Sequence, residues 1–579
     1  MFQTTSTNQV LSYLLLGLVS ILTLTDAGAQ RRKKKTQSAR KEAFSPEEQL
    51  KTFQLPPGFE IELVASEENG LLNPIDLAFD DAGRLWTQTA KMYPLDPIQN
   101  IKWGKLLELL KTGDDTEIRK EYPEYSRIQD LYQLKTKGED KLLIIADPTK
   151  RVEGQVSTFA DGLAIPQSIL PYKNGAFVAH GSELLFLEDT NQDGLADKHQ
   201  TILTGFGFND SHTMSHTLVR GPAGWVHFAH GALNSGKVVA PKSGAATQIG
   251  YSKIARFSLD GEKVEVLGGG LQNIWGFHLK ENGQWYGTEA NDFGWSLTPL
   301  HPMMMYKGIG NQKLRDYQPI PKPFHNFRVG GTGISGLAYD ENGSKGFPEK
   351  WKKVGFLANC ITSTINCVVA DRRADGSVIS EHLTDFLTCS DDWFRPVNIE
   401  FGPDGCLYIV DWYNKIVSHN EVARDHPDRD RAHGRIWRIR HQSQKPTPIP
   451  NLITTSNNEL LNHLVADIQW QKRAAWHQIA DRQASELTPQ LQKLVLDQSQ
   501  TLSTRIVALW SLESLHAFDA SILLRLTKDP DPDIRREAAR SLIHFQPDIT
   551  QIIALLTPLS KDPHYICLLY TSPSPRDRG

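Results

Sequence analysis

The chain has 579 residues, of which 39% are hydrophobic, and its formal net charge is −4. This length exceeds the roughly 250 to 300 residues that one hydrophobic core organises, so we expect at least two domains. The nearly balanced charge provides no large positive field, and we therefore expect no nucleic-acid partner.

The amino terminus has the features of an export signal. An apolar run from Leu11 to Leu24 is followed by Asp26-Ala27-Gly28-Ala29, which has the small-x-small pattern of a signal-peptidase site. We predict a signal peptide over residues 1–29, a basic linker over 30–50, and a secreted or periplasmic protein. An uncleaved anchor, which would leave the protein membrane-associated, is the alternative, but the run is shorter than the ~20 apolar residues that span a bilayer.

Residues 51–440 repeat one unit, in which a short apolar strand, a turn with glycine and a second strand follow one another. Intervals of 49 to 62 residues separate the later turn glycines, and such periods are typical of propellers. The first interval is longer, and we predict a helical insertion at about 98–141. The fold predicted is mainly β, a six-bladed β-propeller, with a pair of packed sheets as the alternative. The six turn glycines are Gly83, Gly175, Gly224, Gly283, Gly343 and Gly405.

A second domain follows a linker at 441–456. Its segments have helical periodicity, and a basic residue with an alanine three positions later recurs at Lys472, Arg505 and Arg535. We predict α-helical HEAT/ARM-like repeats over 457–566, which would offer a surface to protein partners. An irregular helical bundle is the alternative. Residues 567–579 resemble translated sequencing-adapter sequence, and we predict that they are an artefact and that the natural chain is longer.

Five cysteines are too few for a disulfide scaffold, and the sequence contains no C-x-x-C-H haem motif. Four of them, Cys360, Cys367, Cys389 and Cys406, lie within about fifty residues. Two disulfides in an oxidising compartment and small buried thiols in strands are both compatible with this spacing.

One loop has the spacing of a calcium site. Asp189, Asn191, Asp193 and Asp197 occupy its first, third, fifth and ninth positions, and Gly194 at the sixth allows the chain to turn. Oxygen ligands at this spacing suit a hard cation, so we predict calcium. The alternative is a solvated turn between two strands.

Histidines cluster in the third repeat, at His212, His216, His227 and His230. No nearby Cys or Glu completes a transition-metal set. Residues four apart share a face of a strand, so His212 and His216 are predicted to line the propeller mouth. Either could act as a general base.

The segment 270–292, GLQNIWGFHLKENGQWYGTEAND, resembles the soluble quinoprotein glucose and sorbosone dehydrogenases. This resemblance implies a pyrroloquinoline quinone (PQQ) cofactor, with cofactor-binding residues at Gln272, Asn273, Glu289 and His230. Gln272 stands where that family has a cofactor-contacting arginine, so one cation for an anionic cofactor is missing. Ala290 likewise replaces a histidine of the family.

A longer resemblance, to the membrane-bound dehydrogenases of planctomycetes and verrucomicrobia, covers most of the chain. It rests on several segments in the same order, among them NPIDLAFDDAGRLW (73–86), DTNQDGLADK (189–198) and FRPVNIEFGPDGCLYIVDWYNKIVSHN (394–420). These proteins combine an export signal, a propeller, HEAT-like repeats and often a c-type cytochrome. The resemblance implies a cytochrome c partner, and haem c only in a further domain.

The last repeat of the propeller is rich in aromatic and polar residues. Trp412, Tyr413, Asn414, His433 and Arg435 could bind sugar by stacking and bidentate hydrogen bonds. The alternative is that this segment closes the propeller, with its charged residues paired structurally.

Two functions are therefore compatible with the sequence. The first is an exported quinoprotein-like dehydrogenase that oxidises a sugar or polyol with His216 or His212 as base and passes electrons to a cytochrome. The second is a non-catalytic scaffold that binds glycan or protein partners. The family layout favours the first, and Gln272 favours the second.

Overall fold

The computed structural model describes residues 42–568 except 99–104, 106–115, 151–154, 232, 270, 272, 292–295, 301–326, 331, 419–421, 446, 518 and 546–547. The predicted signal peptide, most of the basic linker and nearly all of the predicted artefact lie outside the described residues. Within them, no helix is long and apolar enough to cross a membrane.

Six antiparallel sheets form the larger part of the molecule, and we number them as blades in chain order. Blades 1 to 3 are built from β3 (Leu77–Phe79), β4 (Leu85–Gln88), β5 (Asp140–Ile145) and β6 (Val156–Leu163); β7 (Ser168–Tyr172), β8 (Gly175–His180), β9 (Glu183–Glu188) and β10 (Lys198–Thr204), extended by β13 (Gly236–Val239) and β14 (Ala246–Ile249); and β11 (Ser215–Gly221), β12 (Trp225–His230), β15 (Lys253–Ser258) and β16 (Val264–Gly269).

Blades 4 to 6 follow the same plan. They are built from β17 (Ile274–Leu279), β18 (Trp285–Glu289) and β19 (Thr298–Leu300); β20 (Ile334–Tyr339), β21 (Gly355–Asn359), β22 (Thr364–Arg372), β23 (Val378–His382) and β24 (Leu387–Cys389), with β1 (Phe53–Gln54); and β25 (Pro396–Phe401), β26 (Leu407–Asp411) and β27 (Arg435–His441), with β2 (Phe59–Ala65).

The blades form a closed ring. The first strand of each blade contacts the first strand of the next, and β25 of blade 6 contacts β3 of blade 1. Strand β2, near the amino terminus, pairs with β27, so that Phe59 lies opposite His441 and joins the two ends of the propeller. Closure removes exposed strand edges along the ring. The predicted six-bladed propeller is confirmed, and packed paired sheets are excluded.

Five of the six predicted turn glycines lie between the first and second strands of their blades, and Gly175 is the first residue of β8. At Gly283 the backbone has a φ of +82°, which glycine adopts without strain. A Cβ atom at Gly283 would also meet the side chains of Arg536 and Glu537 from the helical region. The repeated turn therefore marks the end of the propeller that faces the helices.

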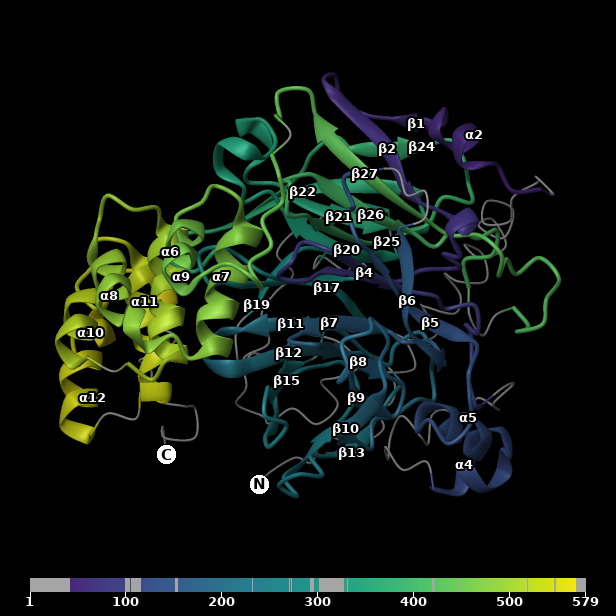
Figure 1. Cartoon of the computed structure of the whole chain (residues 1–579), viewed down its shortest axis with the longest axis horizontal. Helices are drawn as coiled ribbons and strands as arrows, with labels where there is room; N and C mark the ends of the chain where they lie inside the picture. Colours follow the sequence, from purple (N-terminus) through teal and green to yellow (C-terminus); the bar gives the residue numbers. More distant parts are fainter. Residues whose placement is uncertain are drawn as a thin grey trace, which may run out of the picture.

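The helical region packs against this end of the ring (Figure 1). Arg220, at the end of β11, forms a bidentate ion pair with Asp481 at 2.6 and 2.8 Å. The opposite end of the ring carries the insertion between β4 and β5. The helices of the propeller are α2 (Pro46–Leu50), α4 (Thr116–Glu121) and α5 (Glu124–Tyr132), and those of the helical region are α6 (Asn457–Leu464), α7 (Gln469–Arg482), α8 (Thr488–Leu496), α9 (Leu502–Ser514), α10 (Ala520–Leu526), α11 (Pro532–Phe545), α12 (Ile549–Leu556) and α13 (Tyr565–Leu568).

The recurring basic residues of the helical region make a recurring contact. Arg505 pairs with Asp529 and Arg535 with Asp562, so each arginine reaches the segment before the next helices. Lys472 makes the corresponding contact by donating a hydrogen bond to Ser503 Oγ in the first turn of α9. The α-helical region is confirmed, and HEAT/ARM-like repeats stay a prediction.

All five cysteines lie within the described residues and are free thiols. Cys367 is buried in β22 of blade 5, and Cys406 is buried directly before β26 of blade 6. Of the two interpretations of the cysteine cluster, the structure has the buried thiols and not the disulfides.

Candidate functional site

The candidate site lies at the end of the ring away from the helical region, where the first strands of the blades begin. His216 of β11 is fully buried, and its imidazole stacks on the indole of Trp275 in β17, with ring centroids 4.0 Å apart and planes 4° from parallel. Two neighbouring blades therefore present a histidine and a tryptophan as one layer.

His212 belongs to the same cluster, although it precedes β11. Its Nδ1 lies 3.2 Å from the hydroxyl of Tyr93, and its ring centroid lies 5.1 Å from that of Trp275. Tyr93 also packs edge-on against Trp412 of blade 6 at 5.5 Å. Side chains from blades 1, 3, 4 and 6 thus meet here.

Several buried polar atoms of this cluster, or of residues close to it in the chain, have no hydrogen-bond partner within the part of the chain that the structure describes. Buried polar groups are nearly always paired, so such atoms mark positions that a ligand or ordered water can satisfy. These atoms are Ser215 Oγ, His216 Nε2, Asn273 Oδ1, Trp275 Nε1 and Trp412 Nε1.

Burial keeps His216 and His230 neutral. It lowers the pKa of His216 well below its ordinary value, with smaller effects from His230 and His212 in the same direction. Burial also lowers the pKa of His230 to about 4. A neutral imidazole with an unpaired ring nitrogen is a proton acceptor, which is the chemical form that a general base requires.

The residues predicted from the quinoprotein resemblance are partly brought together. Glu289, at the end of β18, accepts hydrogen bonds from the backbone N–H of Asn273 and of Asn291. His230 lies at the end of β12, opposite Ser215 in the strand register. Gln272 lies outside the described residues.

Arg395 is a functional candidate that the sequence reasoning missed. It directly precedes β25 and is 3% exposed, and its guanidinium donates to the carbonyl oxygens of Asn414 at 3.0 Å and Cys360 at 2.9 Å. No carboxylate among the described residues forms an ion pair with it. Burial lowers the pKa of Arg395, because desolvation of the cation outweighs the opposite effect of Cys360 and of the carboxylates of Asp392, Asp411 and Asp391. The available signal was its place before the first strand of a blade, in FRPVNIEF.

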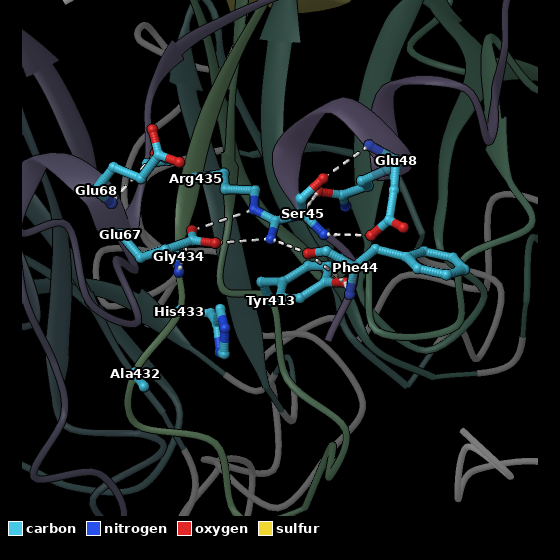
Figure 2. Close-up of polar contacts among 12 residues, drawn as sticks. Phe44, Ser45, Glu48, Glu67, Glu68, Tyr413, Ala432, His433, Gly434 and Arg435 are labelled. Atoms are coloured by element: carbon cyan, nitrogen blue, oxygen red, sulfur yellow. Dashed lines mark hydrogen bonds and ion pairs between the residues drawn. The ribbon is translucent and has the colours of Figure 1, made fainter. Parts of the chain in front are cut away.

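The other predicted residues of blade 6 are occupied by structural contacts. The guanidinium of Arg435 lies 3.8 Å from the ring centroid of Tyr413 and donates to Glu67 at 2.8 and 3.2 Å and to the carbonyl oxygen of Phe44 (Figure 2). Asn414 donates to the carbonyl oxygen of Asp430.

His433 pairs with Asp430 at 2.7 Å, and this hydrogen bond raises the pKa of His433. These contacts agree with the alternative in which the segment closes the propeller. Among the five residues predicted to bind sugar, Trp412 is the one that contacts the cluster, through Tyr93.

The predicted calcium loop joins β9 and β10. Asp189 accepts from the backbone N–H groups of Gln192, Asp193 and Gly194, and Asp197 accepts from Thr190. In the described part of the chain, no three His, Cys, Asp or Glu side chains lie close enough to hold a metal ion. In this conformation the carboxylate oxygens of Asp189 and Asp197 accept hydrogen bonds from within the loop, and calcium binding stays a prediction.

A family model described as a domain of unknown function (DUF7133) matches residues 45–443. No curated protein sequence matches the chain significantly.

Solved structures resemble the chain at low identity. A glucose dehydrogenase is 15% identical with a TM-score of 0.38, covering 65% of this chain and 98% of its own. The PQQ domain of pyranose dehydrogenase from Coprinopsis cinerea is 13% identical with a TM-score of 0.37, covering 67% and 97%. A luciferin-regenerating enzyme is 10% identical with a TM-score of 0.33, covering 68% and 99%.

Proposed function

Because the chain belongs to the family described as a domain of unknown function (DUF7133), whose description assigns no activity, we propose from the residues of this chain that the protein is a quinoprotein-like dehydrogenase. Its substrate would be a sugar or polyol, and its electrons would pass to a cytochrome. The observation that carries the proposal is the buried, neutral His216, stacked on Trp275 with its Nε2 unpaired.

His216 would accept the proton of a substrate hydroxyl at Nε2. Burial excludes water from the imidazole and keeps it unprotonated, so the base is ready when substrate arrives. His212 and Tyr93, which lie within hydrogen-bond distance of each other, would contact the substrate from the adjacent side. The aromatic faces of Trp275 and Trp412 suit the apolar faces of a sugar ring.

The implied cofactor, PQQ, is anionic, and the donors present are suited to such a group. Arg395 is a buried cation whose described partners are two carbonyl oxygens, and Trp412 Nε1 is an unpaired donor on a neighbouring segment. We expect Arg395 to bind a carboxylate of the cofactor, as arginine commonly does through bidentate hydrogen bonds. When bound, the quinone would supply the two-electron acceptor that the side chains lack.

A non-catalytic scaffold is the second candidate. Gln272 and Ala290 favour it, since both replace residues that the quinoprotein resemblance would assign to the cofactor or active site. In that case the cluster would bind a glycan, and the helical repeats would bind protein partners.

The test combines ligand titration with kinetics on the full chain. PQQ is titrated while tryptophan fluorescence is recorded, and reduction of an artificial electron acceptor is then measured with aldoses and polyols, with and without calcium. We expect Arg395→Gln to weaken PQQ binding, and His216→Gln to retain binding but lose the rate. Arg440→Gln, which changes an exposed arginine of β27, is the matched control. Failure of the unaltered protein to bind PQQ or to reduce the acceptor would favour the scaffold.

A further inference from the structure

Thr217, directly after His216, has an unusual backbone conformation. Its φ is +56°, in the left-handed region that β-branched residues strongly avoid. It lies where the register of β11 against β12 shifts between His216 and Val219, so Thr217 is part of a β-bulge. Strained residues of this kind persist where the surrounding structure holds them, and they cluster at functional sites.

The hydroxyl of Thr217 makes two contacts. Its Oγ1 lies 3.0 Å from the carbonyl oxygen of Trp275 and 3.0 Å from Nδ1 of His216. A carbonyl oxygen can only accept, and a hydroxyl has one proton to donate. The Thr217 proton is therefore used by Trp275, and the contact with His216 requires Nδ1 to be the donor.

This assignment leaves Nε2 of neutral His216 without a proton. Nε2 is also the ring nitrogen without a partner among the described residues. We propose that Thr217 is a positioning residue that selects the Nδ1–H tautomer of His216 and so makes Nε2 the proton acceptor of the site. The catalytic consequence rests on the proposed dehydrogenase function, whereas the tautomer is a property of the protein alone.

The same contact prepares the site for proton transfer. When Nε2 accepts a proton, Nδ1–H remains bonded to Thr217, so the imidazolium forms without rearrangement of its neighbour. The bond from Thr217 to the Trp275 carbonyl also links blade 3 to blade 4 and holds the stacked indole beside the imidazole.

The tautomer can be measured directly by ¹⁵N NMR of the full chain with ring-labelled histidine. The His216 resonances are identified by their loss in His216→Gln. We expect a protonated Nδ1 and an unprotonated Nε2 in the unaltered protein and in Thr217→Ser, which keeps the hydroxyl. Thr217→Val keeps the branched shape but removes the hydroxyl, so it should lose the preference for the Nδ1–H tautomer. Thr217→Gly also removes the hydroxyl, and glycine adopts the positive φ of this position without strain.

Thr87→Val is the matched control, because Thr87 is likewise a strand threonine whose hydroxyl donates to a backbone carbonyl, that of Asp76, but it lies in another blade. It should leave the His216 signals unchanged. A protonated Nε2 in the unaltered protein, or an unchanged tautomer in both Thr217→Val and Thr217→Gly, would overturn the proposal.

Kinetics distinguish this inference from the function on which it rests. With an active dehydrogenase, Thr217→Val should lower kcat by about 10- to 100-fold with KM little changed, less than the roughly 100- to 10,000-fold that general-base catalysis supplies. Thr217→Ser should restore the rate. An inactive protein with the expected tautomer would refute the dehydrogenase function and support the positioning role, whereas an active protein in which Thr217→Val has no effect on kcat would overturn that role.

Discussion

Arg435 is predicted to hold the amino-terminal segment against blade 6. Its side chain is fully buried and contacts Glu67, Gln49 and the carbonyl oxygen of Phe44, while its guanidinium stacks on Tyr413. Arg435→Met removes the cation but fills much of its volume, and it leaves the Glu67 carboxylate, whose side chain is 16% exposed, without this partner. Breaking a buried pair from one side costs about 3 to 5 kcal/mol.

The expected loss can be measured by hydrogen exchange of peptides that cover residues 44–65. A cost of about 3 kcal/mol corresponds to an increase of roughly 100-fold in the local opening equilibrium, since every 1.4 kcal/mol is a factor of ten. Arg440 of the same strand pairs with Glu60 of β2, but the two side chains are 35% and 45% exposed, so Arg440→Met should cost only about 0 to 1 kcal/mol. If both variants exchange at the same rate in this segment, Arg435 does not anchor it.

Three further predictions concern other parts of the chain. Burial, and to a smaller extent the charge of Asp76, raises the pKa of Glu400 to about 8, so its ionisation makes the folded state less stable as the pH rises from about 4.3, the pKa in the unfolded chain, through 8. Glu400→Gln should therefore raise the melting temperature more at pH 9 than at pH 5. An equal effect at both pH values would contradict this reasoning. Arg220→Met should speed hydrogen exchange in α7, because it leaves Asp481 unpaired at the interface with the propeller. The free energy of unfolding lost in the double variant with Asp481→Leu should be smaller than the sum of the losses in the two single variants. Additive losses would mean that the two side chains do not couple. Excess calcium should raise the melting temperature and a chelator lower it, with Asp189→Ala abolishing both effects, whereas identical curves would leave the loop as a turn.

The number of blades was predictable because the repeated signal is local. A strand, a turn with glycine at a position such as Gly283 and a second strand lie within about a dozen residues, and the backbone angle of the turn depends on those residues. Six copies at similar spacing then require a closed ring to cover their edges. The α-helical character of the last domain was predictable for the same reason, since helical periodicity is also a short-range property.

The histidine pair was predicted for an incomplete reason. Strand periodicity suggested that His212 and His216 share one face, but β11 begins at Ser215 and is interrupted by the bulge at Thr217. The two rings approach the same indole, because Trp275 of the next blade lies within 4.0 Å of the His216 ring and 5.1 Å of the His212 ring between centroids. No spacing within one repeat could reveal the bulge or the stacking partner.

Two arginines of blade 6 show what depends on the tertiary structure. Arg395 directly precedes β25, Arg435 begins β27, and both have aromatic neighbours in the chain, so the local sequence does not show which of the two is neutralised. The guanidinium of Arg435 meets Glu67, 368 residues away in the chain, whereas the guanidinium of Arg395 donates to the carbonyl oxygens of Asn414 and Cys360. Local spacing and backbone propensity decide strands, turns and helices, but whether a buried charge is neutralised or remains available to a ligand depends on which distant groups the closed ring brings beside it.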